Sequence, residues 1–209
     1  MSREPDRLVM VTGGARSGKS AFAEALAVAS RPPVWYVATA QAPDGSDPEM
    51  QVRIREHQAR RPSDWVTVEA SQEVGRRLQA RSAQGVPPGT ILLDDLGILT
   101  SNRLLALCGD ADPTRETARQ LDALLSRELG DLNAAQQAGG WGLIVVTQEV
   151  GLGIVPATPL GRVFRDALGR ANQRLAARAG EVYLLMAGLP LKLKPPCEHL
   201  FETRPDGSR

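Results

Sequence analysis

The feature that most constrains this chain is a glycine-bounded turn between an apolar strand and a helical pattern. The expected strand, Arg7–Thr12 (RLVMVT), leads into residues 13–20 (GGARSGKS), and a helix-forming run follows. The turn satisfies the pattern G-x-x-x-x-G-K-[ST] in the strand-to-helix context that gives the pattern its meaning. Backbone N–H groups at such a helix start, together with the helix dipole, favour a polyphosphate. The segment therefore predicts a nucleoside triphosphate site.

We expect the nucleotide to contact the whole of this phosphate loop, which comprises Gly13, Gly14, Ala15, Arg16, Ser17, Gly18, Lys19 and Ser20. Lys19 should reach the β- and γ-phosphates as a catalytic residue, and the Ser20 hydroxyl should bind Mg²⁺. Magnesium also needs an acidic partner, and the apolar segment Ile91–Leu93 ends at two carboxylates, Asp94 and Asp95. We take Asp94 as the metal ligand. The alternative is that the two carboxylates cap the next helix or begin a turn.

Short runs rich in Val, Ile and Leu alternate with helix-period segments, a pattern typical of a parallel sheet that is buried on both faces. Strands are expected at Arg7–Thr12, Val34–Thr39, Trp65–Glu69, Thr90–Asp94, Leu143–Gln148 and Glu181–Met186, with an edge hairpin through Leu189–Lys194. Helices are expected at Lys19–Ala29, Glu49–Arg60, Gln72–Arg81, Asn102–Leu107, Pro113–Ala138 and Leu160–Arg178. We predict one α/β domain over residues 1–194 and a loosely attached tail over 195–209.

Composition narrows the class of partner. The 25 Lys and Arg against 24 Asp and Glu give a net charge of +1, which provides no electrostatic basis for binding nucleic acid. The charged start is unlike a signal peptide, and no apolar run approaches the length of a membrane span. Cys108 and Cys197 lie far apart without metal-ligand spacing, which suits a reducing cytoplasm. We expect a cytoplasmic protein, and any partner must be inferred from a site rather than from the charge.

A histidine lies in a highly charged segment, residues 49–62 (EMQVRIREHQARRP). An isolated histidine on such a face, here His57, is usually only solvated. A neutral imidazole can also attack a phosphorus atom and carry a transferred nucleotide as a phosphoramidate. The negative charge of the phosphates could then be balanced by the nearby arginines Arg53, Arg55, Arg60 and Arg61. The residues alone leave both interpretations open.

Further motifs accompany the phosphate loop in a fixed order. They are VTGGARSGKS at 11–20, YVATA at 36–40, the pattern E-M-x-x-R-I-x-x-H-x-x-x-R-P-x-x-W at 49–65, and GLGIVP at 151–156 followed by FRD at 164–166 and GRANQ at 169–173. Together they resemble the bifunctional adenosylcobinamide kinase and adenosylcobinamide-phosphate guanylyltransferase family of cobalamin biosynthesis. The resemblance runs from about Leu8 to Lys194, nearly the whole chain.

The resemblance implies a RecA-like P-loop fold, a homotrimer and two reactions. In the first, a nucleoside triphosphate, ATP or GTP, phosphorylates adenosylcobinamide. In the second, GTP guanylylates a catalytic histidine, which falls on His57, and the GMP passes to adenosylcobinamide phosphate. The resemblance also implies Mg²⁺ as a cofactor. Outside the phosphate loop, the family's nucleotide contacts fall on Ala38, Thr39, Ala40, Gln58, Ala59, Arg60, Arg61, Glu69 and Asp94.

The chain departs from the family pattern at two positions. The family often has Glu where this chain has Asp94, which is one methylene shorter, and often has Asn where this chain has Gln148. Two other functions remain possible. The first is a simple P-loop kinase of small molecules, which would need no covalent histidine. The second is a RecA-like nucleotide-regulated binding protein, which would be expected to carry a basic stripe or an extension; this composition supplies neither.

Overall fold

The computed structural model describes residues 8–40, 52, 61–82, 85 and 87–194. The strands are β1 (Leu8–Gly13), β2 (Val34–Ala38), β3 (Val66–Glu69), β4 (Thr90–Asp94), β5 (Gly142–Val146), β6 (Glu181–Met186) and β7 (Leu189–Lys194). The helices are α1 (Lys19–Val28), α3 (Val74–Ser82), α4 (Leu96–Cys108), α5 (Arg115–Gly139) and α6 (Pro159–Arg178). The strands form one seven-stranded sheet in the order β3-β2-β4-β5-β1-β6-β7.

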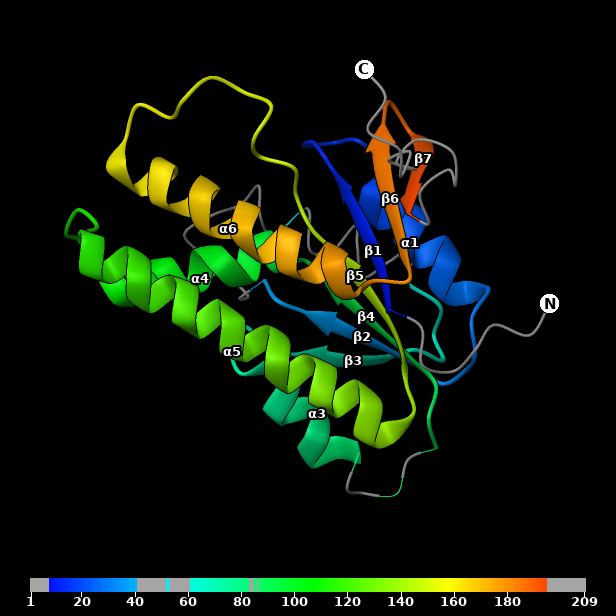
Figure 1. The fold of residues 1–209 in the computed structure, drawn as a ribbon. Coiled ribbons are helices and arrows are strands. Elements are labelled where there is room, and N and C mark those ends of the chain that lie inside the picture. Colours follow the sequence, from blue (N-terminus) through cyan, green and yellow to red (C-terminus); the bar gives the residue numbers. More distant parts are fainter. Residues whose placement is uncertain (1–7, 41–51, 53–60, 83–84, 86, 195–209) are drawn as a thin grey trace, which may run out of the picture.

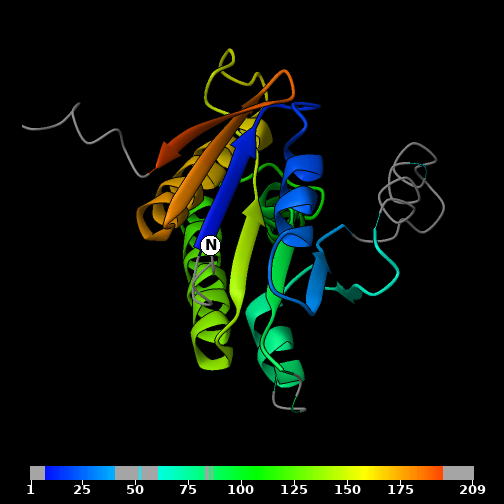
Figure 2. The ribbon, with the colours of Figure 1, turned by 90° about the vertical axis from the view of Figure 1, so that its right-hand side faces the viewer.

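The sheet is parallel from β3 to β6, and only β7 runs antiparallel to its neighbour. Helix α1 covers one face, and α3 to α6 cover the other (Figures 1 and 2). The predicted α/β fold, with a mainly parallel sheet and an antiparallel C-terminal edge, is therefore confirmed. Apart from residue 52, the helix expected over 49–60 lies outside the described residues, as does the tail expected over 195–209.

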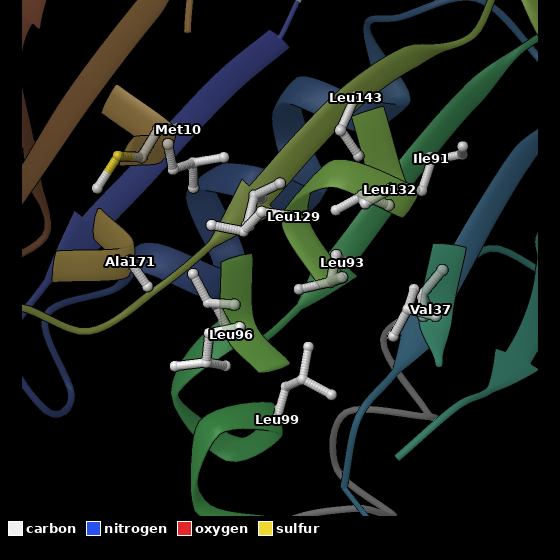
Figure 3. Close-up of a cluster of buried hydrophobic side chains, with 14 of the residues drawn as sticks. Met10, Val37, Ile91, Leu93, Leu96, Leu99, Leu129, Leu132, Leu143 and Ala171 are labelled. Carbon is white, nitrogen blue, oxygen red and sulfur yellow. The ribbon is translucent and has the colours of Figure 1, made fainter. Parts of the chain in front are cut away.

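Alternation along the strands builds a hydrophobic core on each side of the sheet. In β4, Ile91 and Leu93 belong to the core under α3 to α6, whereas Leu92 belongs to the core under α1. Figure 3 shows the larger core, where leucines of α4 and α5 meet the side chains of the central strands. Because successive side chains of a strand point to opposite faces, a strand that is buried on both sides must be apolar throughout.

Helix α4 differs from the prediction, which placed a helix only at Asn102–Leu107. The helix begins at Leu96, because the Asp95 side chain accepts a hydrogen bond from the Ile98 N–H and caps its first turn. Its first residues, Leu96 to Thr100, are largely buried and lack the polar face that marks an amphipathic helix. The predicted boundary was therefore wrong, although the segment is helical.

The order of the strands determines where a ligand can bind. β1, which carries the phosphate loop, lies between β5 and β6, and β5 separates it from β4. All six parallel strands end at one edge of the sheet, so the loops after β1, β2, β4 and β5 meet there. In open α/β sheets ligands bind outside the carboxyl ends of the strands.

Candidate active site

The phosphate loop has the strand-turn-helix geometry that its sequence predicts. β1 ends at Gly13, and α1 begins at Lys19 after Gly18, whose φ is 91°. A side chain on Gly13 would place its Cβ 2.6 Å from both the Leu185 carbonyl oxygen and the Ser17 Oγ, so only glycine fits. Lys19 is buried, and its Nζ donates to the Gly14 carbonyl at 3.3 Å. The lysine amine thus lies within the loop that is predicted to bind phosphates.

The C-terminal hairpin supports this loop from outside. The Gly188 N–H, in the turn between β6 and β7, donates to the Ser17 carbonyl at 3.0 Å. A Cβ on Gly18 would lie 3.3 Å from the Gly188 Cα, so the two turns are in close contact. The Ser17 Oγ is buried and has no hydrogen-bond partner among the residues that the structure describes. A buried polar atom in the loop is thus left for a ligand to satisfy.

Asp94 ends β4 and faces the phosphate loop. Its Oδ1 accepts a hydrogen bond from the Ser20 Oγ at 3.2 Å, and its Oδ2 accepts one from the Tyr36 hydroxyl at 2.7 Å. Hydroxyl and carboxylate oxygens are the ligands that Mg²⁺ prefers, and Mg²⁺ usually takes only one or two from the protein beside phosphates and waters. The donor set of Ser20 and Asp94 therefore fits the predicted ion. No larger group of His, Cys, Asp or Glu suited to a metal occurs in the described part of the chain.

Asp95 has a different task from its neighbour. Its Oδ1 accepts the Ile98 N–H at 2.6 Å, and its Oδ2 accepts the Gln148 Nε2 at 3.2 Å. Burial raises the pKa of the Asp95 carboxyl, and the hydrogen bond from Ile98 opposes that rise in part. The alternative stated from the sequence was that the two aspartates cap the next helix or begin a turn. In the structure Asp95 caps α4 while Asp94 points to the loop.

The segment after β2 is held by buried polar contacts. Thr39 is buried, and its Oγ1 accepts the Asp95 N–H at 2.9 Å. Asn102 of α4 donates from its Nδ2 to the Thr39 carbonyl at 2.9 Å. These bonds fix the backbone around Ala38 to Ala40 beside the end of β4. Thr39 was predicted from the sequence and Asn102 was not, because its contact depends on how α4 lies beside the end of β2.

A second amide, Asn172 of α6, supports the end of β5. Its Nδ2 donates to the Gln148 carbonyl at 2.9 Å, and its Oδ1 accepts the Thr147 hydroxyl at 2.7 Å. Next to Gln148, the Glu149 N–H donates to the Gly13 carbonyl at 3.1 Å. The exposed loop 151–155 therefore begins beside the phosphate loop. Asn172 belongs to the GRANQ motif, and that motif was the available signal for its contact.

The remaining predicted nucleotide contacts divide into described and undescribed residues. Glu69 ends β3 and pairs in register with Ala38, which pairs in turn with Asp94, so these three positions form one row at the sheet edge. Arg61 places its guanidinium carbon 3.5 Å from the centre of the Tyr36 ring. The other predicted contacts lie outside the described residues; these are His57, Gln58, Ala59 and Arg60.

Tyr36 makes contacts at the site that were not predicted from the sequence. It belongs to β2, and its side chain is buried, with 2% of its surface exposed. Its hydroxyl nevertheless reaches Asp94, and its ring stacks on Trp65 with centroids 6.3 Å apart. Burial raises the pKa of the Tyr36 phenol, and the Asp94 carboxylate raises it further, so the phenol keeps its proton and donates. A tyrosine in a buried strand needs a partner for its hydroxyl, which was the signal that could have found it.

Comparison with known proteins places this geometry in a family. Residues 9–193 match the family model described as cobinamide kinase / cobinamide phosphate guanyltransferase. The bifunctional adenosylcobalamin biosynthesis protein CobU of Salmonella typhimurium is 42% identical over 187 residues, which cover 90% of this chain and 99% of that protein. The CobU protein of Escherichia coli is 40% identical over the same coverage. CobP of Pseudomonas aeruginosa is 40% identical over 185 residues, covering 88% and 96%.

These matches agree with the resemblance found from the motifs. They extend over the phosphate loop, the row at the sheet edge and the C-terminal hairpin, so the whole site falls within the matched region. Among the described helices, none is long and apolar enough to cross a membrane. The chain belongs to the cobinamide kinase / cobinamide phosphate guanyltransferase family, a family of bifunctional P-loop enzymes that use nucleoside triphosphates.

Proposed function

We propose that this protein carries out both reactions of its family at one nucleotide site. In the first, the aminopropanol hydroxyl of adenosylcobinamide attacks the γ-phosphorus of ATP or GTP, and the diphosphate leaves. In the second, an imidazole nitrogen of His57 attacks the α-phosphorus of GTP, and pyrophosphate leaves. The phosphate of adenosylcobinamide phosphate then attacks the histidine-bound GMP, which yields adenosylcobinamide-GDP and frees the histidine.

The observation that carries this proposal is the convergence of Lys19, Ser20 and Asp94 at one sheet edge. Lys19 would bind the β- and γ-phosphates, which would remain in the loop during the second reaction as the leaving group. Ser20 and Asp94 would hold Mg²⁺, which supplies positive charge to the phosphate oxygens when bound. The loop would thus bind the leaving group in both reactions. The attacked atom differs, because it is the γ-phosphorus in the first reaction and the α-phosphorus in the second.

Arg61 supports the placement of His57 near this loop. His57 precedes Arg61 within one motif, and Arg61 lies over Tyr36, whose hydroxyl contacts Asp94. Arg61, an arginine of the same motif, thus lies near the carboxylate proposed to bind Mg²⁺. An arginine at this position also suits the charge of the α-phosphate.

We further propose that the protein is a homotrimer in the cytoplasm. The β6–β7 hairpin exposes an apolar stripe, in which Met186, Leu189, Leu191 and Leu193 are 60%, 72%, 55% and 47% exposed. Apolar residues gathered on an exposed sheet edge are typical of a contact with another chain. Light scattering on the purified protein should give the mass of three chains, and the mass of one chain would refute the trimer.

The test of the proposed function is covalent labelling with GTP that carries ³²P at the α-phosphorus. In the presence of Mg²⁺ the wild-type protein should acquire a label that survives alkali and is lost in acid, as a phosphoramidate does. His57→Ala should acquire none, while the matched control His199→Ala, which removes the other histidine, should be labelled like the wild type. Absence of label on a folded protein that binds GTP would refute the covalent mechanism and leave a simple kinase.

A further inference from the structure

The Tyr36 side chain connects the two parts of the site. Its hydroxyl contacts the Asp94 carboxylate, and its ring lies under the Arg61 guanidinium. We propose, building on the proposed function, that Tyr36 is a positioning residue that orients the Asp94 carboxylate so that Oδ1 is directed toward Ser20 and the Mg²⁺ site. Tyr36 itself touches neither the metal nor the phosphates in this proposal.

Hydrogen bonds from Ser20 and Tyr36 divide the oxygens of Asp94 between two elements. The Tyr36 hydroxyl, from β2, holds Oδ2 at 2.7 Å, and the Ser20 hydroxyl, from the start of α1, lies 3.2 Å from Oδ1. A carboxylate at the end of a strand can rotate about two side-chain bonds, and a donor on one oxygen removes most of that freedom. The shorter bond is the one to Tyr36, so Tyr36 restrains the carboxylate more tightly than Ser20 does.

The hydroxyl of Tyr36 is itself firmly placed. β2 lies between β3 and β4, and Tyr36 pairs in register with Thr67 on one side and Leu92 on the other. Trp65 stacks on the ring, and only 2% of the tyrosine surface is exposed. Because both neighbouring strands fix Tyr36, its hydroxyl can orient the Asp94 carboxylate before a ligand binds. The carboxylate then loses little conformational entropy when the ligand binds.

The Arg61 contact links this positioning to the segment that carries His57. A guanidinium over an aromatic face is attracted by the ring quadrupole. At 3.5 Å from the ring centroid, Arg61 is within the range of that interaction. The same ring thus meets Arg61, which follows His57 in one motif, and, through its hydroxyl, the carboxylate of the proposed Mg²⁺ site. Tyr36 therefore contacts both the proposed metal ligand and an arginine of the motif that contains His57.

The test measures Mg²⁺-dependent binding rather than turnover. Calorimetry with α,β-methylene-GTP, which cannot transfer GMP, gives the nucleotide affinity in EDTA and over a Mg²⁺ titration. Tyr36→Phe keeps the ring under Arg61 and removes only the hydroxyl. We expect unchanged affinity in EDTA and about a tenfold rise in the Mg²⁺ concentration needed for half-maximal binding, as is usual when a partner of a metal ligand is lost.

Two further variants make the result specific. Tyr183→Phe is the matched control, because Tyr183 is a partly buried tyrosine whose hydroxyl, like that of Tyr36, donates to a carboxylate, here that of Glu181 in β6. It should leave the Mg²⁺ titration unchanged. In an Asp94→Asn background, Tyr36→Phe should cause little further change in the Mg²⁺ titration, since the carboxylate that the hydroxyl orients is then absent.

The outcomes separate this inference from the proposed function. An equal loss of affinity with and without Mg²⁺ in Tyr36→Phe would show a general structural role and overturn the inference. So would an unchanged Mg²⁺ titration, or an undiminished effect of Tyr36→Phe in the Asp94→Asn background. A folded wild-type protein that bound no nucleotide would refute the proposed function, and this inference with it.

Discussion

Asp122 joins the two longest helices by a cluster of charged hydrogen bonds. Asp122 lies on α5 and accepts from two arginines of α6: the Arg174 Nη1 and Nη2 at 3.1 and 2.8 Å, and the Arg170 Nε at 2.9 Å. We predict that Asp122→Asn destabilises the protein at neutral pH, and that the loss disappears in acid. The substitution keeps the size of the side chain and removes its charge.

The magnitude follows from the pKa of Asp122. Hydrogen bonds from Arg174, followed by those from Arg170, lower this pKa from 3.8 to about 2. At about 1.36 kcal/mol for each pH unit, that shift corresponds to at most about 2.4 kcal/mol of stability. The side chains of Asp122, Arg170 and Arg174 are 28%, 44% and 38% exposed, so solvent screening reduces the effect. We expect a net loss of about 1 kcal/mol.

The direction of the pH dependence follows from the lowered pKa. Because the folded-state pKa lies below the unfolded one, the unfolded chain binds more protons in the interval between them. The stabilisation is therefore fully present above the ordinary pKa of 3.8 and is lost as the pH falls through about 2. Wild type and Asp122→Asn should differ at pH 7 and converge in strong acid.

The assay is urea unfolding at a series of pH values, with the free energy of unfolding compared at each. Glu116→Gln is the matched control, because the pair of Glu116 with Arg119 lies on the same helix but is 64% and 81% exposed. It should change stability by only a few tenths of a kcal/mol, about the value of an exposed pair. A difference between Asp122→Asn and wild type that stays constant with pH would refute the electrostatic explanation.

Three further substitutions test the packing and the site. Gly75→Ala would place a Cβ 2.3 Å from the backbone of Asp131, so α3 must move away from α5, and urea unfolding should show a loss of about 3 kcal/mol, whereas Gly153→Ala, with nothing within 4 Å, should change little. Lys19→Ala should lower the rate of phosphoryl transfer to adenosylcobinamide at least about a hundredfold without altering thermal unfolding, as measured by release of nucleoside diphosphate; an unchanged rate would remove Lys19 from the mechanism. Asp95→Ala, which deletes the cap of α4, should cost about 1–2 kcal/mol in urea unfolding, and no loss would show that the cap is dispensable.

Much of the fold could be predicted because its signals are local. The phosphate loop is defined by contiguous glycines and a Gly-Lys-Ser sequence, and the strands by short apolar runs, so β4, β6 and β7 have the predicted bounds. The start of α4 was missed because its first turns are buried and carry no polar face. Local pattern predicts a helix best when one side of it meets solvent.

The division of roles between Asp94 and Asp95 could not be predicted from sequence. Both follow the same apolar strand, and only the start of α4 and the position of β1 decide which carboxylate caps and which faces the loop. The partner of Tyr36 was hidden for a similar reason. Its contact with Asp94 depends on β2 lying beside β4, and sheet order follows from tertiary packing rather than from the spacing of residues.

The position of β1 has a consequence for the order in which the protein can be completed. β1 carries the phosphate loop and is synthesised well before both of its neighbours in the sheet, β5 and β6. The turn at Gly188 that supports the loop comes later still. Contacts between such distant segments form slowly and only after most of the chain is present. A nascent chain therefore displays its most recognisable motif long before it can build the nucleotide site, and incomplete chains that end before the hairpin should not hold nucleotide.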